Sequence, residues 1–423
     1  MALGRMERGD TVVLEDTAGE DAAPEEDPRR DLRHLPALDG LRGLAVAAVV
    51  VFHLGHLRGG YLGVDLFFVL SGFLITSLLL VEHRARRRID LGRFWSRRAR
   101  RLLPALFLVL IGVSLLVAVA TPSAQRARFR GDALATLGYV ANWHAMGHKS
   151  GYWDMFSQPS PLDHMWSLAI EEQFYLVWPL VVAGLLLLAR RRSAGGRRLV
   201  ATVAVAGALA SFAVLAASWS ATDTNRAYYG TDARVGPTLI GAAFAALWVA
   251  SGRDRTRAPA AAAVAVGGNG HGDVDGDGSA PPRQGLAASW PALVGAVALA
   301  LMVWMFATMR GTDPDYYRGG LAAFAAAAVV VVAVVTSGRA GLLGRALSVR
   351  PLRVLGIISY GVYLWHWPVI VYATPARVGV DGATLAVVRV AVTLAVAGLS
   401  FVLVERPIRR GALHGRQVRL ALV

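Results

Sequence analysis

The chain has 423 residues and contains no cysteine. This absence excludes disulfides, cysteine-ligated metal sites and a thiol nucleophile. Lysine is nearly absent too, since Lys149 is the only one, so arginine carries almost all the positive charge behind the formal net charge of +15. We interpret the arginine mainly as compositional bias, and only secondly as a means of binding anions in a bidentate manner.

The first 33 residues lack an apolar leader segment and are acidic with mixed charge, so we expect no signal peptide. We expect residues 1–34 to form a disordered, acidic, cytoplasmic tail and residues 411–423 a short basic cytoplasmic tail. Residues 35–410 between them are predicted to form one membrane domain.

A Gly-, Asp- and Pro-rich stretch at residues 252–286 predicts a flexible cytoplasmic loop within that domain. Asp273, Asp275 and Asp277 match the opening of a calcium-binding loop, but Gln284 stands where such a loop needs a bidentate glutamate. We therefore favour a linker and expect no metal.

Apolar runs dominate the rest of the chain, which is 55% hydrophobic with a mean hydropathy of +0.46. Runs of about 17 to 25 apolar residues predict transmembrane helices. We predict an all-α, multi-pass protein of the cell (inner or plasma) membrane. It has ten transmembrane helices, near residues 37–57, 62–81, 103–121, 165–189, 199–219, 235–251, 287–307, 319–337, 353–373 and 384–404.

The loops between these spans orient the chain. Loops 82–102 and 190–198 each carry several arginines, whereas loops 58–61 and 374–383 carry few. Because basic residues favour cytoplasmic loops, both termini are predicted to be cytoplasmic. The same pattern accounts for the charge through membrane lipids and topology, with no nucleic-acid partner.

The segment near residues 132–146 is moderately apolar but too short and polar to span comfortably. Counting it as a span would invert every later helix. We predict a re-entrant or interfacial helix there, which protein or a water-filled cavity must surround.

Polar side chains interrupt the first two spans. Arg42 and His53 lie eleven positions apart on the first helix, about 16 Å along its axis, and Asp65 and Ser71 follow on the second. Ionisable residues in a span are costly and mark candidate functional sites. His53 fits a general base or a helix-end histidine at the interface, and the residues alone leave these alternatives equal.

Arginines cluster near the cytoplasmic end of the first helix. Arg42 can be joined there by Arg98 and Arg101, which precede the third span. Such a cluster can bind the phosphates of a nucleotide-like cofactor, although anionic lipid headgroups are the simpler ligand on physical grounds alone.

The fourth span begins with adjacent Glu171 and Glu172, so at least one of them faces the protein interior. Tyr175 follows Glu171 by one turn. Glu171 can bind acceptor hydroxyls, orient the histidine, or form a buried salt bridge with an arginine such as Arg234.

In the ninth span, His366 stands between two tryptophans, one turn after Tyr363. It lies deep in the helix, where an interfacial aromatic belt does not reach. We predict an aromatic-lined polar pocket that stacks on a sugar or cofactor ring.

Seven segments of the chain form an ordered set: ALDGLRGLAVAAVVVFH, GYLGVDLFFVLSGFLI, FWSRRARRLLPAL, HMWSLAIEEQFYLVWPL, TDARVGPTLIGA, LRVLGIISYGVYLWHWPV and VERPIRR. In order and spacing they resemble the bacterial membrane-bound acyltransferase-3 family, over roughly residues 35–410. Members of that family include O-acetylases of surface polysaccharides, antibiotics and peptidoglycan.

The resemblance implies roles for several residues. The family's Arg-ten-residues-His signature falls on Arg42 and His53, its Arg-two-residues-Arg signature on Arg98 and Arg101, and its Ser-Gly pair begins at Ser71. It also implies acyl-CoA, usually acetyl-CoA, as cytoplasmic donor. Because thirteen residues follow VERPIRR, we expect no fused extracytoplasmic esterase-like domain of the kind some members carry.

Together these observations predict an O-acyltransferase acting on a hydroxyl of a cell-envelope glycan, a glycolipid or a secondary metabolite. Arg42, Arg98 and Arg101 would hold the donor phosphates, and the catalytic candidates are His53, Arg42 and Glu171. Substrate-binding or structural candidates are Asp65, Ser71, Glu172, Tyr175, Arg234, Tyr363 and His366. The alternatives are a transporter or flippase of anionic lipid-linked sugars and a non-catalytic lipid-binding scaffold.

Overall fold

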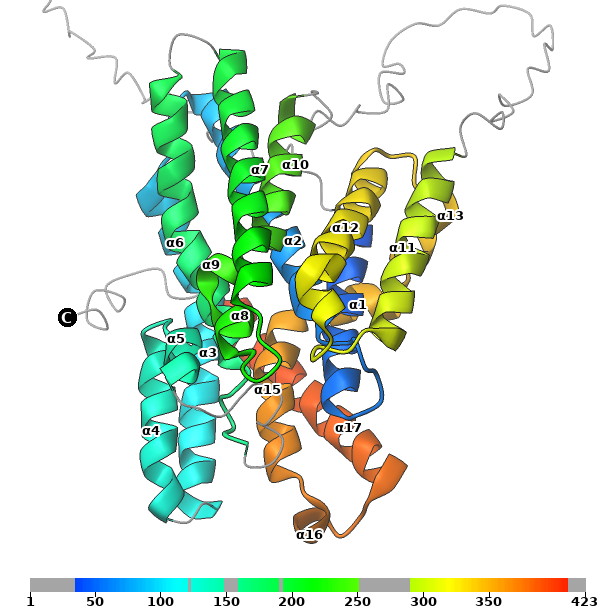
Figure 1. Ribbon diagram of the computed structural model, residues 1–423. Coiled ribbons are helices and arrows are strands. Elements are labelled where there is room, and N and C mark those ends of the chain that lie inside the picture. Colours follow the sequence, from blue (N-terminus) through cyan, green and yellow to red (C-terminus); the bar gives the residue numbers. More distant parts are fainter. Residues whose placement is uncertain (1–34, 121–122, 148–158, 190–192, 251–289, 410–423) are drawn as a thin grey trace, which may run out of the picture.

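The computed structural model describes residues 35–120, 123–147, 159–189, 193–250 and 290–409. Every regular element in these ranges is a helix, which confirms the all-α prediction (Figure 1). The predicted tails 1–34 and 411–423 and the predicted loop 252–286 lie outside the described residues.

Two N-terminal helices, α1 (Pro36–His53) and α2 (Leu62–Arg86), lie in the middle of the bundle. In Figure 1, helices α6 and α7 lie on the left of the bundle, and α11 and α12 lie on the right. Helix α2 packs against α10, α12 and α6, while α1 packs against α14 and α15. The other long helices are α3 (Leu91–Ala120), α6 (Met165–Leu188), α7 (Ser193–Ser218), α10 (Gly236–Ala250), α11 (Trp290–Thr308), α12 (Leu321–Thr336), α15 (Ser359–Tyr372) and α17 (Gly382–Ser400).

Short helices and two π-helical turns connect these elements. They are α4 (Ser123–Leu137), α5 (Ala141–Gly147), α8 (Asn225–Tyr229), α9 (Thr231–Arg234), η4 (Tyr316–Gly320), α13 (Gly341–Leu347), α14 (Arg350–Ile357), α16 (Pro375–Val378), η5 (Phe401–Glu405) and α18 (Arg406–Arg409).

Each predicted span coincides with helical structure. Among the described residues, eight helices are long and apolar enough to cross a membrane. The predicted span 235–251 is the shorter helix α10, and the predicted span 353–373 is the pair α14 and α15, which bend by 76° relative to each other. The protein is therefore a multi-pass membrane protein, while the count of ten and the orientation stay predictions.

The predicted loop 82–102 is wrong in extent. Helix α2 continues to Arg86 and α3 already begins at Leu91, so the arginine run of this segment is mostly helical. Arginine is a good helix former, and the basic run therefore extends the third helix beyond its apolar part. As a result Arg98 and Arg101 lie one turn apart on the same helical face.

The single helix predicted near residues 132–146 is two helices, α4 and α5. Between them Tyr139 adopts a left-handed backbone conformation with φ of 54°, which ends one helix and redirects the chain. Helix α4 has 15 residues, too few to span, and it folds back beside the end of α3 (Figure 1). The Arg126 guanidinium donates to the carbonyl of Ala118 across this pair, at 2.9 Å.

Glycines bring α2 and α10 into very close contact. A Cβ atom added at Gly72 would lie 1.8 Å from the Thr238 carbonyl oxygen, and one added at Gly241 would lie 2.1 Å from the Val69 carbonyl oxygen. Small residues of this kind allow membrane helices to associate through backbone packing. The α2–α10 contact fixes the position of α2, which carries Ser71.

Gly72→Ala should destabilise the protein, because backbone atoms of α10 occupy the space that the new methyl group needs. Overpacking of this kind costs about 1 to 3 kcal/mol. Thermal unfolding in detergent micelles measures the effect. Gly184→Ala in α6 is the matched control, because a Cβ atom there meets nothing within 4 Å, and equal unfolding temperatures for the two variants would refute the packing assignment.

Candidate active site

A pocket lies among α1, α2, α3, α6 and α15. Its apolar wall comes mainly from side chains of α2, including Phe67, Phe68 and Leu74. The lining includes predicted candidates from five helices: Arg42, Ser71, Arg98, Arg101, Glu171, Tyr175 and Tyr363. Polar lining residues that the sequence prediction did not assign to a site are Ser167, Ser359 and Tyr360.

Three guanidinium groups meet in this pocket, from Arg42 on α1 and from Arg98 and Arg101 on α3. Arg42 Nη2 donates to Ser359 Oγ at 3.3 Å, and the Arg98 guanidinium lies 3.8 Å from the ring centroid of Tyr175. Among the described lining residues, Glu171 is the one carboxylate that faces these three cations. The pocket is therefore positively charged and suited to an anionic ligand.

Glu171 takes part in a compact hydroxyl cluster. Its carboxylate accepts hydrogen bonds from Ser71 and Tyr175, and the Tyr175 hydroxyl also lies 2.8 Å from Ser71 Oγ. These contacts join α2 to α6 within the pocket. Of the alternatives raised for Glu171, the salt bridge with Arg234 is wrong, because Arg234 pairs with a different carboxylate.

That carboxylate is Asp65, which Arg234 Nη2 contacts at 2.8 Å with both side chains fully buried. Arg234 also donates to the Tyr316 hydroxyl and lies 4.8 Å from the ring centroid of Tyr228. This pair is outside the pocket lining and joins α2 to α9. Glu172 is outside the lining too, and one of its buried oxygens has no hydrogen-bond partner among the described residues.

A second polar cluster consists of three histidines. His53 ends α1, His366 lies in α15, and His164 directly precedes α6. His366 Nε2 and His53 Nδ1 are 3.0 Å apart, and the ring centroids of His164 and His366 are 5.3 Å apart. The sequence singled out His53 and His366 separately, but neither their contact nor His164 was predicted.

Tyr363 connects the pocket to the histidines. It lines the pocket, its hydroxyl lies 2.6 Å from Ser167 Oγ and 2.8 Å from the carbonyl oxygen of His164, and its own carbonyl accepts from His366 Nδ1 at 2.6 Å. Tyr363, one residue of the predicted aromatic pocket around His366, thus lies between the two polar clusters. Stacking on a sugar or cofactor ring stays a prediction. Arg42 and His53 are about 16 Å apart along α1. Arg42 belongs to the cationic pocket and His53 to the histidine cluster.

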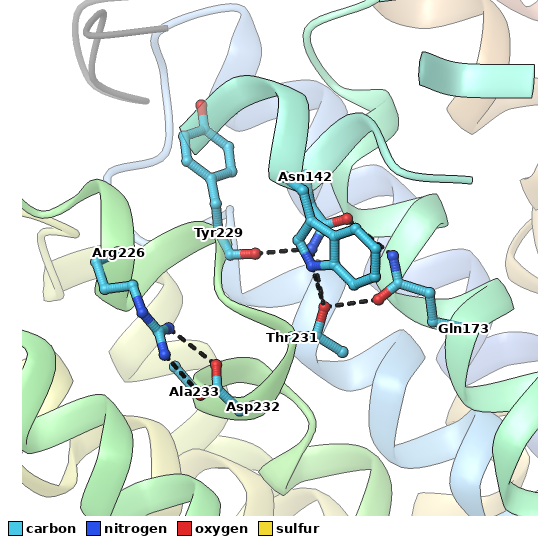
Figure 2. A network of polar contacts seen from close by, with 8 residues as sticks. Asn142, Gln173, Arg226, Tyr229, Thr231, Asp232 and Ala233 are labelled. Atoms are coloured by element: carbon cyan, nitrogen blue, oxygen red, sulfur yellow. Dashed lines mark hydrogen bonds and ion pairs between the residues drawn. The ribbon is translucent and has the colours of Figure 1, made fainter. Parts of the chain in front are cut away.

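A hydrogen-bond network holds the short helices α5, α8 and α9 against α6 (Figure 2). Gln173 donates to Asn142 Oδ1 at 3.0 Å and accepts from the Thr231 hydroxyl at 2.6 Å. Asn142 in turn donates to Thr231 at 2.9 Å and to the Tyr229 carbonyl at 3.0 Å. No sequence pattern indicated these partners, although a glutamine next to two glutamates in an apolar helix indicates contacts inside the protein.

Asp163 directly precedes His164, and its Oδ1 atom lies 3.6 Å from Nη2 of Arg128 in α4. Desolvation raises the pKa of this carboxyl to about 7, although Arg128 opposes the shift. Ionisation of this carboxyl, and with it the attraction to Arg128, increases as the pH rises through this value. This contact ties α4 to the segment that carries His164.

Fold and site together define a multi-pass helical membrane protein with a cationic pocket beside buried histidines. Residues 35–405 match the family model described as an acyltransferase domain. The chain belongs to this family, and the resemblance to the acyltransferase-3 family is confirmed.

Several curated proteins are similar to the chain. Peptidoglycan O-acetyltransferase OatA of Listeria monocytogenes is 36% identical over 385 residues, covering 90% of this chain and 57% of that protein. Putative peptidoglycan O-acetyltransferase YrhL of Bacillus subtilis is 36% identical over 381 residues, covering 89% and 55%. O-acetyltransferase OatA of Staphylococcus aureus is 32% identical over 385 residues, covering 89% and 58%.

The chain thus spans somewhat more than half the length of these relatives. No solved structure matches it.

Asp65→Asn should strongly destabilise the protein, because it leaves Arg234 charged and buried without its counter-ion. Breaking one partner of a buried pair costs about 3 to 5 kcal/mol. The control is Asp232→Asn, which breaks the exposed pair with Arg226 and should cost at most about 1 kcal/mol. Thermal unfolding in detergent measures both, and a loss for Asp65→Asn no larger than for the control would contradict the assignment.

Proposed function

We propose that this protein is a membrane-embedded O-acyltransferase. It transfers an acyl group, acetyl in the simplest case, from acyl-CoA to a hydroxyl of a cell-envelope glycan such as peptidoglycan. Family membership and the names of the relatives support acetyl transfer to a glycan. The observation that carries the proposal is the cationic pocket that Tyr363 connects to the histidines.

Two features of the pocket support a coenzyme A thioester as the donor. Arg42, Arg98 and Arg101 supply planar guanidinium groups, which bind phosphate oxygens in a bidentate manner. The apolar wall from α2 suits the uncharged arm of the donor. Lipid headgroups carry phosphates as well, but three arginines from two helices converging inside a pocket favour a ligand that enters the protein.

The proposed reaction uses His53 as the general base. A neutral imidazole nitrogen takes the proton of the acceptor hydroxyl while the hydroxyl oxygen attacks the thioester carbon. The new carbon–oxygen bond forms, the carbon–sulfur bond breaks, and the proton passes from His53 to the leaving thiolate. Glu171 accepts hydrogen bonds from Ser71 and Tyr175 and lies beside the arginines. In this mechanism it positions the acyl donor in the pocket.

The transporter alternative is not favoured by the relatives, whose names describe acetyl transfer. Release of free CoA by the purified protein separates the two functions, because a flippase consumes no acyl donor.

Replacing His53 by alanine should lower kcat about 10²- to 10⁴-fold, the usual range for a lost general base. The KM for acetyl-CoA should stay unchanged, because His53 does not line the arginine pocket. The assay measures CoA release and mass-spectrometric detection of O-acetylated glycan in proteoliposomes. His56→Ala, at an exposed histidine just after α1, is the control, and full activity of His53→Ala would refute the mechanism.

Arg101→Gln should raise the KM for acetyl-CoA about ten- to a hundredfold, the scale of one lost charge-assisted hydrogen bond. Arg100→Gln is the matched control, because this neighbouring arginine is exposed and does not line the pocket. The same steady-state assay measures both variants. If they behave alike, surface charge rather than the pocket binds the donor.

A further inference from the structure

The contact between His366 and His53 connects two helices that are far apart in the chain. His366 is fully buried and His53 nearly so, at 8% exposure. The chain of contacts runs from the Tyr363 carbonyl through His366 Nδ1, at 2.6 Å, and from His366 Nε2 to His53 Nδ1, at 3.0 Å. It joins the backbone of α15 to the end of α1.

Hydrogen-bond chemistry fixes the direction of this chain. A carbonyl oxygen can only accept, so His366 Nδ1 carries a hydrogen and donates it to Tyr363. A neutral imidazole has one donor and one acceptor nitrogen, so His366 Nε2 is the acceptor. His53 Nδ1 must then be the donor, which leaves the lone pair of neutral His53 on Nε2.

We propose that His366 is the positioning residue that sets the tautomer and ring orientation of His53. This inference rests on the proposed function, in which His53 is the base, and it names Nε2 as the atom that receives the proton. The opposite tautomer would place two lone pairs against each other at 3.0 Å and lose a buried hydrogen bond. A buried donor or acceptor left without a partner is unfavourable, so the opposite tautomer is disfavoured.

The arrangement also stabilises the charged state that forms during the reaction. When His53 Nε2 takes a proton, His53 Nδ1 still donates to His366 Nε2, and this bond becomes charge-assisted and stronger. An interaction that strengthens as the reaction proceeds raises kcat rather than substrate affinity. His366 itself needs no change of protonation and does not line the donor pocket.

The surroundings of His366 hold its ring in place. The adjacent Trp367 donates to the Ser160 carbonyl at 2.8 Å, and its ring lies 4.8 Å from that of His53. His164 packs edge-on against His366 and donates from Nε2 to the Leu364 carbonyl at 3.2 Å. Contacts with α15 and with the segment before α6 therefore hold the orientation of the His366 ring.

Three substitutions test the proposal by separating shape from hydrogen bonding. His366→Phe keeps a ring without an acceptor, His366→Asn keeps a donor for the Tyr363 carbonyl, and His366→Gln can place an amide oxygen near the position of the acceptor Nε2. We expect kcat to fall about tenfold or more for Phe and Asn, with partial recovery for Gln. The KM for acetyl-CoA should remain that of the wild type.

Full kcat in His366→Phe, or a Gln variant no more active than Phe when both unfold at the wild-type temperature, would overturn the proposal. His56→Phe is the control for loss of an unrelated histidine. Activity of His53→Ala bears on the proposed function itself, so an inactive His53→Ala with an active His366→Phe would overturn only the role of His366.

A spectroscopic measurement on the wild-type protein needs neither activity nor a folded variant of His366. Solid-state ¹⁵N NMR of histidine-labelled protein, with the His53 signal assigned by its loss in His53→Gln, reports which ring nitrogen carries hydrogen. The proposal predicts a protonated Nδ1 and an unprotonated Nε2 in neutral His53. The reverse pattern would overturn it.

Discussion

The buried ion pair between Asp65 and Arg234 is the constraint on which the site depends. Two charges removed from water are costly unless they meet each other and further polar groups. Here Arg234 pairs with one oxygen of Asp65 and donates to the Tyr316 hydroxyl, which joins α2 to α9 and η4. Ser71 follows Asp65 on the same helix, and the hydroxyl cluster around Glu171 forms because α2 is held there.

The polar groups of the membrane domain fall into two clusters with different physical tasks. The cationic pocket formed by Arg42, Arg98 and Arg101 is an electrostatic site, where cations in a low-dielectric setting attract an anionic ligand more strongly than at an open surface. In the proposed mechanism the histidine cluster transfers the proton, and the direction of transfer depends on which ring nitrogen carries hydrogen. Tyr363 belongs to both, through its side chain in one and its carbonyl in the other.

Most of the helical architecture could be predicted from the sequence, because a lipid environment permits few structures other than long apolar helices. The convergence of Arg42 with Arg98 and Arg101 was also predictable, since all three precede or end apolar runs at one membrane face. The hydropathy pattern predicted a loop at the arginine-rich start of α3. A helical segment that extends beyond the membrane is polar, so no apolar run marks it in the sequence.

Pairings between distant helices could not be predicted. Asp65 and Glu171 are both acidic residues in apolar helices, so sequence offered no means to decide which one meets Arg234. His53 and His366 are 313 positions apart, and their contact depends on the 76° bend between α14 and α15. The network of Gln173 likewise depends on where the short helices α5 and α9 dock.

In the proposed function, donor binding and proton transfer occupy separate places in the protein, which Tyr363 connects. Direct binding of radiolabelled acetyl-CoA to purified His53→Ala, with free CoA followed in the same sample, tests it most directly. The account predicts binding as tight as that of the wild type and almost no release of CoA in the presence of a glycan acceptor. Loss of acetyl-CoA binding in this variant, or undiminished release of CoA, would contradict it.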